Sequence, residues 1–286
     1  MRKKVLFIGM LVTLLFAFSG CGTKSEGVVT MIMSDVQEGD HPTAQACDKF
    51  AELVKKRTNG KVVIEVYHGS TLGTEAEQIA QATVGGIDFV RVSSPVSAYY
   101  DDIKAFQALY LYSSEDDMWK VLDGEIGNEF LKAQQLKDNG LEGLCWVSGG
   151  SRNFYNNVRP ITSPEDLAGL TLRVNTDSMF AFLESCGAKG VNVSYNDIYN
   201  SIEAGTIDGA ENNWPSYIST GHYKVAPYIT VDEHTRIPEM IVASTESMNK
   251  LTSEQQQIVR ECARSTSHPA ETNLFPDWAD KLRNTS

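Results

Sequence analysis

Apolar and polar residues follow two alternating patterns along the chain. Three short apolar runs bounded by polar or turn residues are typical of buried strands: GVVTMIMS (27–34), KVVIEVY (61–67) and GIDFVRV (86–92). TAQACDKFAELVKKRTNG (43–60) instead repeats apolar residues every three or four positions and ends in Asn-Gly, which predicts an amphipathic helix. Thr74 and Glu77 have the spacing of a capping box and predict a second helix that runs to about Val84. This region therefore alternates strands with helices.

The same alternation returns after residue 160. Ser163 precedes a proline at the first helical position, which favours a capped helix start. LTLRV (170–174) is typical of a short strand, and Ser194 with Asp197 predicts a helix that ends at Gly205. Two segments repeat one pattern, a helix, a glycine turn and an Ile-Asp pair: QIAQATVGGIDF (78–89) and DIYNSIEAGTIDGA (197–210). These patterns predict an α/β protein of two similar lobes with a ligand cleft between them.

A lone arginine stands inside the short predicted strand LTLRV. In LTLRV, Leu172 and Val174 point to one side, and Thr171 and Arg173 point to the other. A guanidinium is always charged in proteins, so Arg173 needs an anion or water beside it. The chain itself has a formal net charge of -12, which makes this isolated cation a candidate for binding an anionic ligand.

The first twenty residues have the layout of a secretory signal. A basic start at residues 2–4 precedes the apolar run VLFIGMLVTLLFAF, which ends at small residues before Cys21. The cysteine directly after Ser-Gly also resembles a bacterial lipobox, in which Cys21 is lipidated and becomes the new N-terminus. Ordinary secretion with an incidental cysteine is the alternative. The polar stretch CGTKSEG follows without a positive stop signal, which disfavours a membrane-spanning anchor.

Charge and cysteine content restrict the partners further. Removal of residues 1–20 takes away three positive charges and no negative ones, so the mature chain carries -15. A surface this acidic repels nucleic acid and anionic lipid, so any anionic ligand must meet local positive charge in a sheltered place. Four further cysteines are scattered without a C-x-x-C motif and are expected to act as small core residues: Cys47, Cys145, Cys186 and Cys262.

Catalytic and metal-binding motifs are missing from the sequence. It has no G-x-S-x-G, no H-E-x-x-H, no phosphate-binding glycine loop and no G-x-G-x-x-G. Five histidines occur and none pairs with another at i, i+4: His41, His68, His222, His234 and His268. The sequence therefore predicts neither an enzyme nor a metal or cofactor site.

Polar residues at strand ends and turns instead predict an anion site. GGSRNFYNN (149–157) places Arg152 after a glycine pair, and DGAENN (208–213) places two amides, Asn212 and Asn213, just past a turn. A guanidinium offers a planar fork matched to a carboxylate, and amides add directional hydrogen bonds. Either arginine alone is more simply explained as a structural salt bridge. Together with Arg173 in one lobe, they favour a carboxylate-binding site.

Two long segments carry a family resemblance. GSRNFYNNVRPITSPEDLAGLTLRV (150–174) precedes YNDIYNSIEAGTIDGAENN (195–213) at a characteristic distance. On these segments the chain resembles the solute-binding proteins of TRAP transporters, the tripartite ATP-independent periplasmic carriers of organic acids. The resemblance extends from about Gly27 to about Ser267. It implies a two-lobed α/β fold like that of periplasmic binding proteins, with segments that cross between the lobes as hinges.

The resemblance also implies roles for individual residues. Arg173 would clamp the carboxylate of the ligand, and Arg152 and Asn212 would line the same pocket. The ligand would pass to separate membrane permease subunits, and no nucleotide or other cofactor is implied. The protein is expected to be a monomer outside the cytoplasmic membrane.

A narrower resemblance concerns the ligand. Four segments look like the branch of the family that binds hexuronates such as glucuronate and galacturonate: SSPVSAYYDDIKAF, SRNFYNN, ENNWPSYISTGHYKVAPY and DEHTRIPEM. This branch implies that Glu75 and His41 approach the sugar, while Asn213 can add a further amide. Glu75 also falls in the first turn of a helix, where a carboxylate is favoured without any ligand. Trp214 and Tyr155 are candidates to cover the apolar face of the sugar, although core packing is the favoured role for both.

The expected organisation combines a leader with two discontinuous lobes: residues 1–20 signal peptide, 21–26 tether, 27–148 with about 238–275 lobe I, and 149–237 with about 276–286 lobe II. The sequence NLFPDWADKLRNTS stops where members of the family continue through further helical segments, so the chain is either naturally short or truncated. Other functions remain open at this point. They are a TRAP protein for another acid such as a C4-dicarboxylate or keto acid, an exported carbohydrate-active enzyme, and a ligand sensor.

Overall fold

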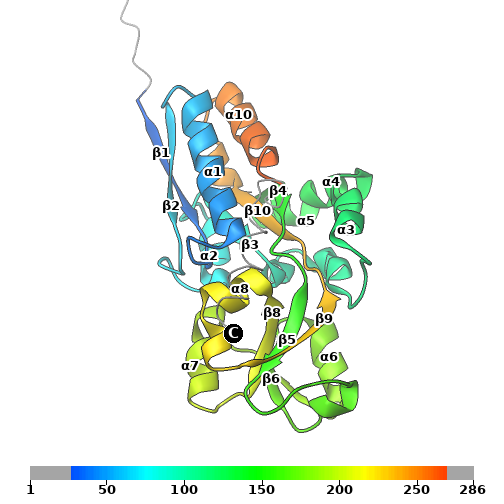
Figure 1. Cartoon of the computed structure of the whole chain (residues 1–286). Coiled ribbons are helices and arrows are strands. Elements are labelled where there is room, and N and C mark those ends of the chain that lie inside the picture. The colour runs from blue at the N-terminus through cyan, green and yellow to red at the C-terminus, as the bar shows by residue number, and fades with distance from the viewer. Residues whose placement is uncertain (1–26, 269–286) are drawn as a thin grey trace, which may run out of the picture.

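Two five-stranded sheets, each covered by helices, form the two ends of the molecule (Figure 1). This computed structural model describes residues 27–268. The first sheet has the order β2-β1-β3-β10-β4 and is the basis of lobe I. Its strands are β1 (Val29–Ser34), β2 (Val62–Tyr67), β3 (Phe89–Val92), β4 (Leu141–Val147) and β10 (Glu239–Ser244). β1 runs parallel to β2 and β3, whereas β10 lies antiparallel between β3 and β4.

The second sheet has the order β7-β6-β8-β5-β9 and is the basis of lobe II. Its strands are β5 (Arg152–Asn156), β6 (Thr171–Arg173), β7 (Lys189–Val191), β8 (Gly209–Asn213) and β9 (Tyr228–Thr235). β6 is parallel to β7 and β8, and β5 is antiparallel to β8 and β9. The two mixed sheets with their helices confirm the predicted α/β fold of two lobes.

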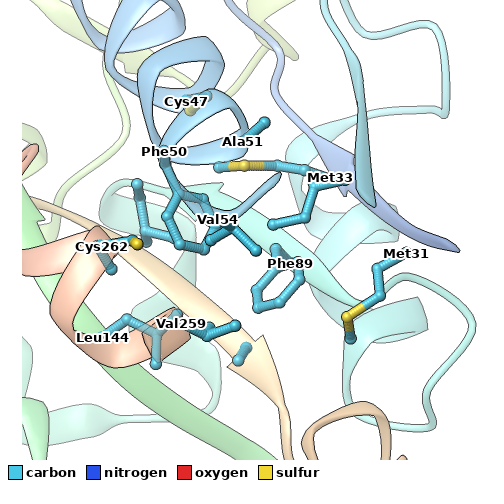
Figure 2. Packing of buried hydrophobic residues seen from close by; sticks show 14 of the residues in the cluster. Met31, Met33, Cys47, Phe50, Ala51, Val54, Phe89, Leu144, Val259 and Cys262 are labelled. Atoms are coloured by element: carbon cyan, nitrogen blue, oxygen red, sulfur yellow. The ribbon is translucent and has the colours of Figure 1, made fainter. Parts of the chain in front are cut away.

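Helices cover both faces of the first sheet. They are α1 (Pro42–Arg57), α2 (Glu75–Ala82), α3 (Glu115–Leu122), α4 (Glu125–Leu131), α5 (Gln134–Asp138), α9 (Thr245–Met248) and α10 (Ser253–Arg264). Figure 2 shows Phe50 and Val54 of α1 facing Phe89 of β3 and Val259 of α10, all of them fully buried. The rings of Phe50 and Phe89 meet edge to face at 5.3 Å. Burial of one such side chain contributes about 1.5–3 kcal/mol.

Lobe II is also packed on both faces of its sheet. Its helices are α6 (Asp177–Ser185), α7 (Ile198–Glu203) and α8 (Trp214–Ser219). One face buries Phe154 and Leu172. The opposite face buries Tyr155 and Ile198, and Trp214 packs against it. Successive residues of β5 therefore face different cores, as the two-residue period of a strand requires.

Within residues 27–268 the chain passes between the lobes twice, from β4 to β5 over residues 148–151 and from β9 to β10 over residues 236–238. The strands of the first sheet therefore come from before and after the segment that forms the second sheet.

The signal peptide (1–20), the tether with Cys21 (21–26) and the expected last part of lobe II (276–286) lie outside the described residues. Within residues 27–268, no helix has the length and apolar character needed to cross a membrane. The four cysteines of this part are free thiols.

Two predicted helix starts differ from expectation. Ser163 begins only a short 3₁₀ helix (Pro164–Leu167), and the segment from Ser194 forms a 3₁₀ turn (Tyr195–Asp197) before α7. The Ser194 hydroxyl donates to the carboxylate of Asp197 at 2.6 Å and makes no cap to a backbone N–H. By contrast, the capping box of Thr74 and Glu77 is formed, and α2 begins directly after Thr74.

Candidate ligand-binding site

A cavity of about 550 Å³ lies between the two lobes. This volume falls within the range of small-molecule sites. Lobe I contributes the loop after β1, the first turn of α2, the 3₁₀ helix Ser94–Ala98 and the first residue of β10. Lobe II contributes the start of β5, the ends of β6 and β8, and the loop of residues 192–196. Four of the predicted site residues line this cavity: Glu75, Arg152, Arg173 and Asn212.

Arg173 brings an unmatched positive charge to the cavity. It ends β6, its side chain is buried, and its Nε donates to the carbonyl oxygen of Val193 at 2.9 Å. Among residues 27–268, no carboxylate lies within ion-pair distance of this guanidinium. Burial lowers the pKa of Arg173, the direction expected for a cation removed from water without an adjacent anion. The guanidinium of Arg173 is therefore available to bind a carboxylate group of a ligand.

Arg152 also lines the cavity, but its charge is already matched. Its Nε and Nη2 donate to the two carboxylate oxygens of Glu211 at 2.5 and 2.9 Å, and Nη1 donates to Asn212 Oδ1 at 2.8 Å. Burial alone would raise the pKa of Glu211, but Arg152 and His234 outweigh it and lower the value to about 2. His234 is in turn bonded to Asp232, 2.9 Å away. Arg152 thus positions Asn212 without adding net charge.

The register of the second sheet places Arg173 in a row with two other residues. Arg173 lies opposite Ala210 of β8, which lies opposite Tyr155 of β5, so the three share one face. The Tyr155 ring is fully buried, and its hydroxyl is 2.8 Å from Nδ1 of His222. Burial, reinforced by the charge of Arg173, lowers the pKa of His222 to about 3. His222 is therefore neutral at pH 7. Neither Tyr155 nor Trp214, the two candidates to cover the sugar, lines the cavity.

The lobe I side of the cavity is acidic. Glu75 accepts hydrogen bonds from the backbone N–H and hydroxyl of Ser93, and Glu239 accepts one from Arg91 Nη1 at 3.1 Å. Arg91 also donates through Nε to Asp35 at 2.8 Å and is itself almost fully buried. One guanidinium thus faces several carboxylates. Burial raises the pKa of Glu239 to about 7.

His41 and Asn213 do not line the cavity, although both are buried. His41 caps α1, where its Nδ1 accepts from the backbone N–H of Thr43 at 3.2 Å. Its Nε2 lies 3.5 Å from Asn213 Oδ1 and 3.3 Å from the hydroxyl of Ser216. Burial lowers the pKa of His41 to about 4, so the ring is neutral at pH 7. The structure therefore places these two predicted residues at a contact between the lobes.

Sequence reasoning missed Glu239 and Arg91. Arg91 stands inside the apolar strand GIDFVRV, the same signal that singled out Arg173. Glu239 begins EMIVAS, a strand that is otherwise apolar until its last residue and is buried throughout. A carboxylate at the start of such an apolar strand could have indicated a buried residue with a polar partner.

Two buried polar atoms of cavity residues have no hydrogen-bond partner in the described part of the chain: Ser94 Oγ and Asn175 Oδ1.

Hydrogen bonds also join the lobes beside the cavity. The Tyr195 hydroxyl donates to Gln37 Oε1 at 2.5 Å, and the Ser70 hydroxyl donates to Asn196 Oδ1 at 2.6 Å. Gln37, Tyr195 and Asn196 are themselves cavity residues. The structure therefore shows the lobes in contact across the cavity.

Comparisons with known proteins match most of the chain. The family model described as bacterial extracellular solute-binding protein, family 7, matches residues 33–284. A solute-binding protein of Chromohalobacter salexigens is 34% identical over 231 residues, which are 80% of this chain and 68% of that protein.

Solved structures agree with this match. A TRAP periplasmic solute-binding protein from Sulfitobacter sp. NAS-14.1 with bound β-D-galacturonate has a TM-score of 0.84 at 30% identity, over 89% of this chain and 86% of the other. One from Chromohalobacter salexigens with bound D-glucuronate has a TM-score of 0.83 at 30% identity, over 89% and 85%.

Proposed function

The chain belongs to family 7 of the bacterial extracellular solute-binding proteins, and we propose that its cavity binds a hexuronate such as glucuronate or galacturonate. Family membership confirms the resemblance to TRAP solute-binding proteins and the prediction of a binding protein that is not an enzyme. Such proteins act outside the cytoplasm. In the proposal, lipid on Cys21 tethers the protein to the membrane, and membrane permease subunits receive the ligand.

The unmatched guanidinium of Arg173 carries the proposal. A ligand carboxylate would supply the absent negative charge and can accept two parallel hydrogen bonds from the planar fork. Arg152 is paired with Glu211, so Arg173 is the one cavity arginine without a carboxylate partner among residues 27–268. This arrangement favours a ligand with one carboxylate.

The acidic wall of lobe I favours hydroxyl groups at the other end of the ligand. Glu75 and Glu239 are cavity residues, and carboxylates accept hydrogen bonds from hydroxyls. A second carboxylate of a C4-dicarboxylate would face these acids instead. Two unit charges of one sign 4 Å apart repel by about 4 kcal/mol at an effective dielectric constant of 20. The bound galacturonate and glucuronate of the similar structures support the same class of ligand.

Calorimetric titration of the purified protein tests this function. Glucuronate, galacturonate, glucose and succinate are compared under identical conditions. We expect one or both uronates to bind at least about a hundredfold more tightly than glucose, which leaves Arg173 buried without an anion. Succinate as the tightest ligand, or glucose equal to glucuronate, would overturn the proposal.

A further inference from the structure

Glu239 is a buried carboxylate on the cavity wall with spare hydrogen-bonding capacity. It is the first residue of β10, directly after the segment that crosses from lobe II, and only 4% of its surface is exposed. Its Oε2 accepts the hydrogen bond from Arg91. Its Oε1 accepts none from residues 27–268. A carboxylate is rarely buried in this way unless a partner completes its hydrogen bonds.

Arg91 links Glu239 to Glu75. Nη1 of Arg91 lies 3.1 Å from Glu239 Oε2 and 3.8 Å from Glu75 Oε2. The two carboxylates come from different elements, β10 and the first turn of α2, and this one nitrogen lies between them. Arg91 is anchored from the other side by its bond to Asp35 at 2.8 Å. The guanidinium therefore fixes the two cavity carboxylates beside each other.

The charges of this cluster select the chemistry of its partner. One guanidinium faces Asp35, Glu75 and Glu239, so another anion at this wall is disfavoured. An uncharged donor such as a hydroxyl satisfies a carboxylate oxygen without adding charge. Two neighbouring carboxylates can each accept a hydrogen bond from a different hydroxyl of one ligand molecule.

We propose that Glu239 is a specificity-determining residue that accepts a hydrogen bond from a ligand hydroxyl, and that Arg91 is the positioning residue that holds it beside Glu75. The inference rests on the proposed hexuronate function and names a second polar contact for the sugar. Glu75 and Glu239 then accept from different hydroxyls, while Arg173 binds the carboxylate at the opposite wall.

Titration of Glu239→Gln with hexuronates and their single-deoxy analogues tests the proposal. The substitution keeps the size of the side chain and removes the carboxylate. Titration at pH 8, above the pKa of Glu239 of about 7, keeps the wild-type side chain ionised. A hydrogen bond to a charged group is worth about ten- to hundredfold in affinity, and we expect that loss for the best-bound uronate. For the deoxy analogue that lacks the contacted hydroxyl, the variant and the wild type should bind equally. Glu75→Gln should lose its effect with a different deoxy analogue.

Glu142→Gln is the matched control, because Glu142 is a lobe I carboxylate paired with Arg260 and lies outside this cavity. Glu239→Asp keeps the carboxylate but has a shorter side chain, and it serves as a second test if Glu239→Gln does not fold. Melting curves check the fold of each variant. An equal loss for every analogue would assign Glu239 a structural role only, and an unchanged affinity would remove it from the site. Both outcomes leave the hexuronate function intact. Failure of the wild type to bind any hexuronate would instead reject both proposals.

Discussion

The hydroxyl of Tyr195 donates a hydrogen bond of 2.5 Å to the side-chain carbonyl of Gln37, and this bond joins lobe II to lobe I at the cavity. Gln37 lies in the loop after β1 and Tyr195 begins a 3₁₀ turn, so neither is held by a sheet or a long helix. A neighbouring bond from Ser70, in the loop after β2, to Asn196 also joins the two lobes. Opening of the cavity by separation of the lobes requires both bonds to break.

Removal of this bond should speed ligand release. We expect Tyr195→Phe to raise the dissociation rate about two- to tenfold, the effect of one net hydrogen bond, and to leave the association rate nearly unchanged. Stopped-flow fluorescence measures both rates. Tyr199→Phe in α7 is the control, because the Tyr199 hydroxyl makes no hydrogen bond within the described residues. An unchanged dissociation rate in Tyr195→Phe would show that the bond does not restrain opening.

The two cavity arginines should respond oppositely to the same substitution. Arg173→Met removes a buried cation that has no protein anion, so we expect the free protein to keep or gain melting temperature. Ligand binding should fall by tens- to thousands-fold, which corresponds to about 2–5 kcal/mol. Arg173→Lys should bind weakly, because an ammonium cannot form the bidentate fork.

Arg152→Met should instead destabilise the free protein by about 3–5 kcal/mol, because it leaves Glu211 buried without its partner. Urea unfolding of both methionine variants gives the comparison. Arg159→Met in the same lobe is the control, because the Arg159 side chain donates to backbone carbonyls and has no carboxylate partner among residues 27–268. A similar loss of stability at Arg152 and Arg173 would contradict the charge assignment.

His222 should make the fold sensitive to mild acid. Its pKa in the folded protein is about 3, against 6.5 in a model peptide, so below pH 6.5 the unfolded chain binds a proton that the folded chain does not. Stability should therefore fall as the pH drops from 6.5 towards 3. The loss from this residue amounts to about 2 kcal/mol at pH 5.

His222→Gln should remove that part of the pH dependence when urea unfolding is compared at pH 7 and pH 5. His268→Gln provides the control, because the His268 side chain is partly exposed. A pH dependence identical to that of the wild type would place the proton uptake elsewhere, for example at His41.

Cys21→Ala should release the protein from membranes, or leave an uncleaved precursor, without a change in ligand affinity. Stable anchoring takes more than one acyl chain, which the lipoprotein pattern implies. Intact-mass analysis of wild-type protein extracted from membranes checks the assignment. An unmodified Cys21 in that material would contradict it.

The sequence was informative where chemistry depends on neighbours in the chain. The capping box of Thr74 and Glu77, the presence of strands in the predicted apolar runs, and Arg173 inside its strand are local features, and the structure contains them. The helix starts predicted at Ser163 and Ser194 were wrong, because only 3₁₀ turns begin there. Glu239 and Arg91 were missed because their meaning depends on strand order, which places β10 between β3 and β4. Strand order is set by packing across the whole lobe and leaves no mark in residue spacing. For the same reason, the sequence did not show that Glu211 neutralises Arg152 and not Arg173.

The position of β10 also affects how the protein forms as it emerges from the ribosome or crosses the membrane. All strands of the second sheet lie within residues 152–235, whereas β4 has β10 as its one partner in the described sheet. Lobe II can therefore pair its strands before β10, the partner of β4, has been added to the chain. Long-range pairing of this kind is slow. We therefore expect Arg173 to be in place before Glu239, and the cavity to be completed when β10 enters the first sheet. Limited proteolysis of chains truncated after residue 236 should cut β4 while β5 and β8 stay protected.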